Sequence, residues 1–161
     1  MGYRVLLTRN SDRTLSLDQR SRMSNAAKAD LFVSIHMNAT TAGAVRGIET
    51  FALTPPGASS SGSETVLYNR YPGNAALLNS AALAMSVQRS LIRTTGAVDR
   101  GMKRARFVVL RETRCPAILV ECGFVSNRSD ESLLGSAAYR DKLAQALAQG
   151  IRNYHLRVRP K

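Results

Sequence analysis

Short apolar runs alternate along this chain with longer segments whose apolar residues recur at helical spacing. Continuous or alternating apolar runs predict buried strands at residues 3–8, 31–35, 47–53, 107–110 and 117–120. Helical spacing and capping residues predict helices at residues 17–29, 75–94, 129–134 and 137–154. Strands that alternate with helices predict an α/β fold, in which helices cover both faces of a mostly parallel, twisted sheet in three layers.

One segment interrupts this alternation. Residues 54–73 contain Pro55-Pro56-Gly57 and a serine-rich run from Ser59 to Ser63, which are strong loop signals. A loop of this length inside a compact domain is usually functional or mobile. We expect it to border the binding cleft. The rest of the chain has no internal repeat and no linker, so we expect one domain over residues 1–161.

Charge narrows the range of partners without selecting one. The chain has 23 Lys and Arg against 11 Asp and Glu, a net charge of +12. This charge favours polyanions such as nucleic acids, anionic lipid headgroups or anionic wall polymers. The densest basic cluster, at residues 100–114, is consistent with either a solvated face or a polymer-binding surface. Aromatic residues make up 6% of the chain and no familiar nucleic-acid motif is present, so no nucleic-acid partner is expected.

Two other features exclude further classes of protein. No apolar run reaches the ~20 residues that a membrane span requires, so we expect no membrane span. Two cysteines, Cys115 and Cys122, are too few for a disulfide framework and match no familiar zinc pattern. The first residues lead directly into an apolar run without a secretory signal, as they also would in a mature exported fragment.

Two titratable residues directly follow buried strands. His36 comes after Leu31–Ile35, and Glu121 comes after Ala117–Val120. If these strands are parallel, both side chains lie at the sheet edge where α/β proteins bind ligands. An imidazole there is a candidate metal ligand and a partly buried carboxylate is a candidate acid or base. The alternatives are a hydrogen-bonded structural histidine, and a glutamate that caps a helix or pairs with an arginine.

The residues around these two positions resemble known motifs. Matches in the same order continue along nearly the whole chain and are weakest in the serine-rich loop, which makes the resemblance specific. The matching segments are residues 2–9, 12–20, 34–39, 47–50, 100–112 and 120–127. Together they resemble the N-acetylmuramoyl-L-alanine amidase family, specifically the AmiC-like zinc amidases with a type 3 catalytic domain.

The resemblance implies a function. These enzymes are peptidoglycan hydrolases that cleave the amide bond between N-acetylmuramic acid and the L-alanine of the stem peptide. The family uses Zn²⁺ held by two His and one Glu, and a further Glu as general base. By position, His36 matches the second zinc histidine, Glu121 matches the catalytic glutamate, and Asn38 is a candidate substrate-binding residue. The resemblance also implies a monomer in the periplasm or at the cell wall, with peptidoglycan as its partner.

The sequence departs from the family pattern at its start. The family domain opens with a strand that carries a Gly-His-Gly-Gly-type motif, followed by a ligand Glu, and neither motif is present here. His155 is expected to be remote from the site, and Glu49 is expected to be a strand residue paired with an arginine rather than a zinc ligand. We therefore expect an N-terminally truncated domain, missing the first strand of the family fold, that is inactive and poorly stable alone. The alternative is a catalytically dead wall-binding remnant.

Overall fold

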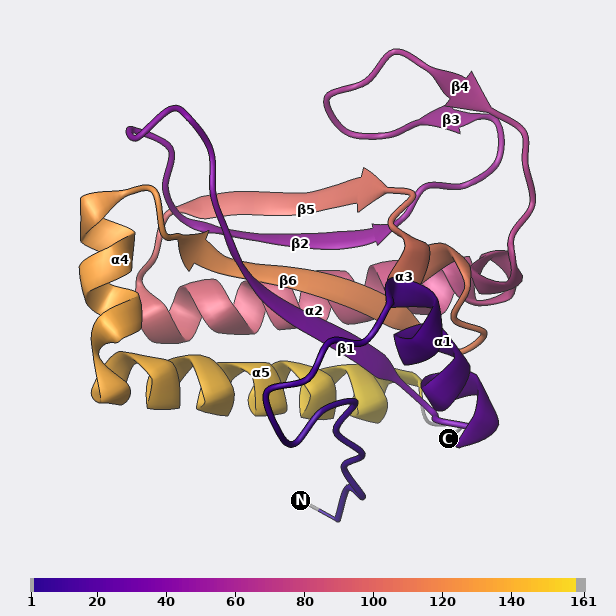
Figure 1. The fold of residues 1–161 in the computed structure, drawn as a ribbon, viewed down its shortest axis with the longest axis horizontal. Helices are drawn as coiled ribbons and strands as arrows, with labels where there is room; N and C mark the ends of the chain where they lie inside the picture. Colours follow the sequence, from indigo (N-terminus) through magenta and orange to yellow (C-terminus); the bar gives the residue numbers. More distant parts are fainter. Residues whose placement is uncertain (1, 159–161) are drawn as a thin grey trace.

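A four-stranded mixed sheet forms the centre of the molecule (Figure 1), in a computed structural model that describes residues 2–158. The strand order is β1-β6-β2-β5. Pairs β1–β6 and β2–β5 are parallel, whereas β2 and β6 are antiparallel. The strands are β1 (Phe32–Asn38), β2 (Ile48–Leu53), β5 (Asp99–Ala105) and β6 (Ala117–Phe124).

Helices cover both faces of the sheet, so the predicted three-layer α/β fold is confirmed (Figure 1). Two long helices, α2 (Leu77–Thr95) and α5 (Ala137–Val158), pack together under one face. Short helices α1 (Leu17–Ala26) and α3 (Val108–Arg111) contact each other on the opposite face. Helix α4 (Arg128–Gly135) follows β6 at the end of the sheet.

Strand β6 divides the core into two clusters because successive side chains point to opposite faces. Ile118, Val120 and Cys122 pack with α2 and α5 in the larger cluster. Ala117 and Leu119 pack in a smaller cluster, on the face that carries α3. All five are nearly inaccessible to solvent. By the same alternation, Glu121 belongs to the face of the smaller cluster.

The predicted strand at residues 3–8 is wrong. These residues form no strand, and their apolar side chains are exposed, with Val5 76%, Leu6 58% and Leu7 66% accessible. Figure 1 shows this segment running over the surface toward α1. A short apolar run indicates a strand only where another strand pairs with it, and no described strand pairs with this segment.

The region around residues 99–111 was also assigned incorrectly. Residues 107–110 were expected to form a strand, but Val108–Arg111 form one helical turn. The true strand, β5, comes just before it and reads Asp99-Arg100-Gly101-Met102-Lys103-Arg104-Ala105. Its charged and glycine residues have low strand propensity, so pairing with β2 stabilises it where propensity does not.

The long segment after β2 forms an arm rather than a structureless loop. It contains the two-stranded β3 (Ala58–Ser59) and β4 (Val66–Leu67), followed by the 3₁₀ turn η1 (Pro72–Ala76). Arg106 holds the arm, since its Nη2 donates to the carbonyl oxygen of Ala58 at 2.6 Å. The arm follows Leu53 and therefore lies beyond the end of β2 opposite to Glu49 (Figure 1).

Within residues 2–158, no helix has both the length and the apolar character that crossing a membrane requires.

Candidate functional site

Three titratable side chains form a row across the sheet. His36 on β1 is the register partner of Glu121 on β6, and Glu121 is in turn the register partner of Glu49 on β2. Register partners project from the same face, which here is the face opposite to α2 and α5. The predicted proximity of His36 and Glu121 is therefore confirmed by the parallel pairing of β1 with β6.

Glu121 sits at the centre of this row in a poorly solvated position. Its Oε2 is buried and, among residues 2–158, has no hydrogen-bond partner. Burial, and secondarily the negative charge of Glu49, raise the pKa of Glu121 to about 7. A carboxyl group with this pKa exchanges a proton readily near neutral pH, as a general acid or base must.

His36 is held by a neighbour on its own strand. The side chains of Ser34 and His36 project from the same face, and Ser34 Oγ lies 2.9 Å from His36 Nε2. Burial, and secondarily the positive charge of Arg20, lower the pKa of His36. The imidazole is therefore neutral at physiological pH, which is the form that ligates metals.

Glu49 is almost completely buried, at 3% exposure, and is neutralised by two cations on β5. Its Oε2 lies 2.6 Å from Lys103 Nζ and 2.8 Å from Arg100 Nε. Burial alone would raise the pKa of Glu49, but these two ion pairs outweigh it and the pKa is lowered. The expectation that Glu49 pairs with an arginine is confirmed, while Lys103 and the position of Glu49 beside Glu121 were not foreseen.

Asn38, the predicted substrate-binding residue, makes its hydrogen bonds inside the protein. Its Nδ2 donates to Glu49 Oε1 at 3.2 Å, and its Oδ1 accepts from the backbone N–H of Ala39 at 2.8 Å. In this structure Asn38 thus connects the end of β1 to Glu49. Whether it also contacts a substrate stays a prediction.

A second buried carboxylate fixes the strand ends around the row. Asp130 on α4 accepts hydrogen bonds through Oδ2 from the backbone N–H groups of Gly47, at 2.8 Å, and Phe124, at 2.9 Å. These are the residues at the start of β2 and the end of β6. Asp130 therefore holds together the strand ends that carry Glu49 and Glu121.

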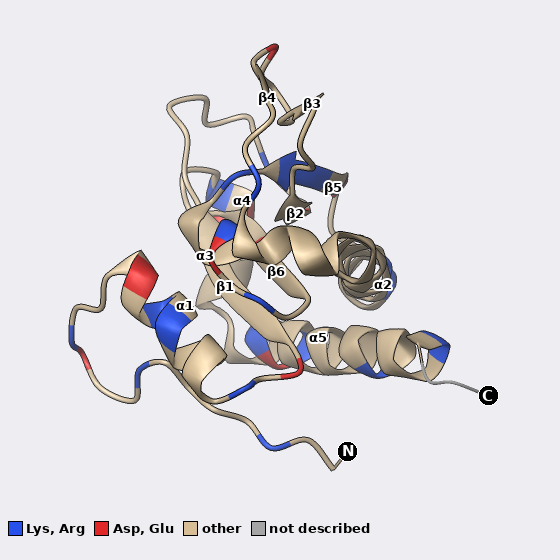
Figure 2. Cartoon of the chain, turned by 90° about the vertical axis from the view of Figure 1, so that its right-hand side faces the viewer, with Lys and Arg blue, Asp and Glu red and all other residues tan. Residues whose placement is uncertain are grey.

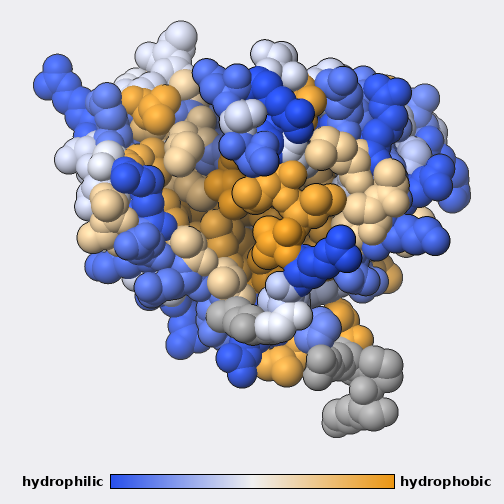
Figure 3. All heavy atoms as spheres, turned by 60° about the horizontal axis from the view of Figure 1, so that its bottom comes forward, coloured by the Kyte–Doolittle hydropathy of each residue, from blue (hydrophilic) through white to orange (hydrophobic). Residues whose placement is uncertain are grey.

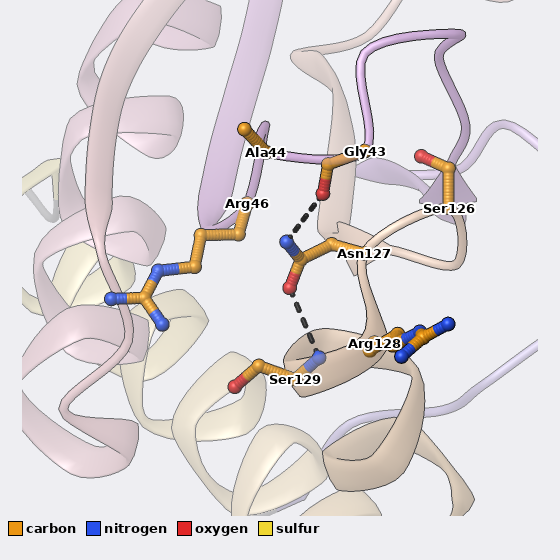
Figure 4. A pocket seen from close by; sticks show the side chains of 7 residues that line it. All are labelled: Gly43, Ala44, Arg46, Ser126, Asn127, Arg128 and Ser129. Carbon is orange, nitrogen blue, oxygen red and sulfur yellow. Dashed lines mark hydrogen bonds between the residues drawn. The ribbon is translucent and has the colours of Figure 1, made fainter.

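Loops that follow β1 and β6 enclose a pocket of about 500 Å³ next to these strand ends (Figure 4). Asn127 spans it, because its Nδ2 donates to the carbonyl oxygen of Gly43 at 2.7 Å and its Oδ1 accepts from the backbone N–H of Ser129 at 3.1 Å. The second of these bonds caps the N-terminus of α4. Arg46 and Arg128 also line the pocket, so two basic residues border it.

A larger groove, of about 550 Å³, runs along β1 between the N-terminal segment and α1. Leu6, Leu7 and Ile35 line it and are each more than half exposed. Figure 3 shows hydrophobic residues gathered in a hollow on the lower side of the molecule, surrounded by hydrophilic ones. Ser34, which contacts His36, also lines this groove.

The described residues fit one ligand of a zinc site rather than a complete one. Zinc sites of hydrolases use three protein ligands and leave one position open. His36 offers an imidazole, but nowhere in residues 2–158 do three or more His, Cys, Asp or Glu side chains group so as to hold a metal. His155 lies on α5, under the opposite face of the sheet. Its ring packs edge-on against that of Tyr3, with 5.9 Å between the ring centroids.

Known proteins resemble this chain over nearly its whole length. A family profile described as N-acetylmuramoyl-L-alanine amidase matches residues 1–153. The chain is 35% identical to the uncharacterized protein YqiI of Bacillus subtilis, covering 96% of this chain and 65% of that protein. It is also 35% identical to the N-acetylmuramoyl-L-alanine amidase LytC of the same species, covering 96% of this chain and 27% of LytC. The chain thus spans less than two thirds of the length of these relatives.

Solved structures agree with this assignment. The crystal structure of an N-acetylmuramoyl-L-alanine amidase from Clostridium difficile 630 superposes with a TM-score of 0.79 at 32% identity, covering 98% of this chain and 74% of the other. The catalytic domain of CwlV, an amidase from Bacillus (Paenibacillus) polymyxa, gives a TM-score of 0.77 at 33% identity, with 97% and 74% covered.

Proposed function

Because this chain belongs to the N-acetylmuramoyl-L-alanine amidase family, we propose that it acts on peptidoglycan, cleaving the amide bond between N-acetylmuramic acid and the L-alanine of the stem peptide. The observation that carries the proposal is the buried Oε2 of Glu121, which has no hydrogen-bond partner among residues 2–158 and lies directly beside His36 in the sheet. A histidine and a carboxyl group of this kind suit amide hydrolysis. The proposed place of action is the cell wall or periplasm, where peptidoglycan lies.

In the proposed reaction Glu121 acts first as a base. Its ionised carboxylate takes a proton from a water molecule while the water oxygen attacks the carbonyl carbon of the lactyl amide. The same carboxyl group then returns the proton to the nitrogen of L-alanine, and the C–N bond breaks to leave a carboxylic acid and a free amine. A group of pKa about 7 can both take and return this proton at neutral pH.

His36 is proposed as one ligand of a Zn²⁺ ion. The lowered pKa of His36 supports this role because a neutral imidazole is required. The other ligands of the set are not found among residues 2–158. This observation favours a second candidate function, a wall-binding domain of the same family without catalytic activity.

Hydrolysis of purified peptidoglycan separates the two functions. The 161-residue chain and the longest reading frame of its gene are incubated with peptidoglycan, and newly released L-alanine amino groups and bound zinc are measured. If the protein is an amidase, the wild type releases amino groups. Turnover should be about 10²–10⁴-fold lower in Glu121→Gln, and the zinc content should be lower in His36→Ala. Glu112→Gln, a carboxylate outside the row, serves as the matched control and keeps full activity.

Binding to insoluble peptidoglycan without any release of amino groups, in both forms and in the presence of zinc, would instead establish the non-catalytic domain. Release that is unaffected by Glu121→Gln would contradict the role proposed for this residue.

A further inference from the structure

Strand β5 contains one extra residue beside Glu49. Ile48 pairs with Asp99 and Thr50 pairs with Met102, so two steps along β2 face three steps along β5. Gly101 lies within this irregularity and adopts φ +77°, a left-handed conformation that favours glycine. The irregularity is therefore a β-bulge, a feature that changes the direction in which a side chain points.

The bulge places two cations on the same face of the sheet. In a regular strand, Arg100 and Lys103 would project from opposite faces because they are three residues apart. Here both side chains reach the same atom, Glu49 Oε2. One buried carboxylate therefore faces two cations, which leaves one unit of positive charge at the edge of the catalytic row. Figure 2 shows that Lys and Arg residues occur along β5.

Both cations keep hydrogen-bond donors that the described part of the chain does not use. Arg100 contacts Glu49 only through Nε, and in residues 2–158 its two Nη groups make no hydrogen bond. Lys103 uses one of its three donors on Glu49. Their side chains are 30% and 28% exposed, so a ligand can reach them. Paired Nη groups of an arginine fit the two oxygens of a carboxylate.

Aromatic rings fix the direction of both side chains. The Arg100 guanidinium carbon lies 5.1 Å from the centre of the Phe124 ring, and Lys103 Nζ lies 5.9 Å from the centre of the Phe51 ring. Cation–π contacts of this length orient a cation without using its hydrogen-bond donors. Arg100 also contacts Glu49, the register partner of Glu121, so it is held next to the row that contains the proposed catalytic carboxylate.

We propose that Arg100 and Lys103, brought to one face by the Gly101 bulge and anchored on Glu49, form a subsite that binds a carboxylate on the peptide side of the substrate. The subsite determines specificity, since it favours stem peptides with a free carboxylate over those in which the same group is a carboxamide. This inference rests on the proposed amidase function for the identity of the ligand, but binding alone can test it.

A pair of ligands that differ in one group provides the test. The probes are the γ-methylamides of N-acetylmuramoyl-L-alanyl-D-glutamate and N-acetylmuramoyl-L-alanyl-D-isoglutamine. Because the γ-carboxyl group is blocked in both, they differ only in that the α-carboxylate of the first, its one carboxylate, is a carboxamide in the second. Both probes are titrated by calorimetry into the Glu121→Gln protein, because this substitution prevents turnover. A chelator is present so that the carboxylate of the probe cannot bind a metal. We expect the carboxylate form to bind about tenfold or more tightly.

Substitutions in this background assign the preference to the subsite. Arg100→Gln should reduce the ratio of the two affinities to near one. Arg104→Gln removes the same charge from the same strand, at an exposed position with no side-chain contact to Glu49, and should keep the ratio. Thermal unfolding of both variants shows whether each remains folded. If Arg100→Gln does not fold, Lys103→Gln replaces it in the test.

Equal affinity for the two probes, or a preference that survives in both Arg100→Gln and Lys103→Gln, would overturn the proposal. Binding of neither probe would overturn it too. The peptidoglycan hydrolysis assay answers separately whether the protein is an amidase, so loss of the subsite and loss of the proposed function are distinguishable.

Discussion

His36 and Glu121 face each other as register partners on the parallel strands β1 and β6, although they are far apart in the sequence. Their pairing places an imidazole next to a carboxyl group whose Oε2 is buried without a partner within residues 2–158. Glu49 continues the row on the other side of Glu121. The negative charge of Glu49 contributes to the raised pKa of Glu121, and the first of the following predictions depends on that pKa.

Glu121 should make the folded protein less stable as pH rises toward neutrality. Its pKa is about 7 in the folded state against 4.5 for an unperturbed carboxyl. Between these values the folded state keeps a proton that the unfolded state has released, so the free energy of unfolding falls with rising pH. The full difference corresponds to roughly 3 kcal/mol, and partial solvent access reduces it to about 1–3 kcal/mol.

Chemical denaturation of wild type and Glu121→Gln, with a chelator present, checks this prediction at pH 5 and pH 8. The difference between the two proteins reports the titration of Glu121 together with its interaction with Glu49. Glu121→Gln should gain stability relative to wild type on going from pH 5 to pH 8. A constant difference would mean that Glu121 titrates as an ordinary carboxyl group.

Replacing Glu49 should destabilise the fold more than replacing an exposed acidic residue. Glu49→Gln leaves Arg100 and Lys103 close together without their shared counter-charge, and we expect a loss of about 1–3 kcal/mol. Glu112→Gln is the matched control, because Glu112 pairs with Arg111 at a site where the two side chains are 34% and 37% exposed. Such pairs contribute about 0–1 kcal/mol. Urea denaturation at neutral pH measures both, and equal losses would show that burial of Glu49 has no energetic consequence.

Arg106 should determine the mobility of the β3–β4 arm without affecting the core. Its guanidinium donates to the carbonyl oxygen of Ala58 at 2.6 Å and to Ser60 Oγ at 3.2 Å. Arg106→Ala removes these bonds, so limited proteolysis should cut residues 55–71 several-fold faster, while the melting temperature changes little. Arg104→Ala removes an exposed side chain, whereas Arg104 contacts the arm through its backbone N–H. The cleavage rate of this variant should therefore match wild type. Equal rates in all three proteins would show that other contacts hold the arm.

Close packing of α2 on α5 should make Gly150 intolerant of a side chain. A Cβ at this position would lie 2.7 Å from Val87 Cα and 3.2 Å from the carbonyl oxygen of Ser86, both of which are backbone atoms that cannot move independently. Gly150→Ala should therefore lower the free energy of unfolding by about 1–3 kcal/mol, even though alanine favours helices.

Gly135→Ala is the control, since a Cβ there meets no atom within 4 Å. It should leave stability unchanged or raise it by a few tenths of a kcal/mol up to about 1 kcal/mol. Thermal or urea denaturation compares the two variants. If both behave alike, the spacing between α2 and α5 is less restrictive than their contact indicates.

The sequence was sufficient where polar residues interrupt strongly apolar runs. Buried strands around Leu31–Ile35 and Ala117–Val120 were predicted because such runs are stable only inside a sheet. The polar residues that directly follow the two runs are His36 and Glu121. Periodicity was also sufficient for α2 and α5, whose apolar residues recur over several turns. These features depend on residues that are close together in the sequence, which is why the sequence predicts them.

Pairing between segments that are distant in the sequence determined which of the other segments form strands. Residues 3–8 look like a strand but pair with no described strand, whereas Asp99–Ala105 look unlike one and pair with β2. Strand formation therefore depended on the partner rather than on propensity.

By itself the sequence thus determined the fold class, the family and two of the residues of the candidate site, His36 and Glu121. Only the tertiary structure placed Glu49 beside Glu121 and turned Arg100 and Lys103 toward it. The reason is physical: strand register and a one-residue bulge select which side chains meet, and both arise from hydrogen bonds between strands that are remote in sequence.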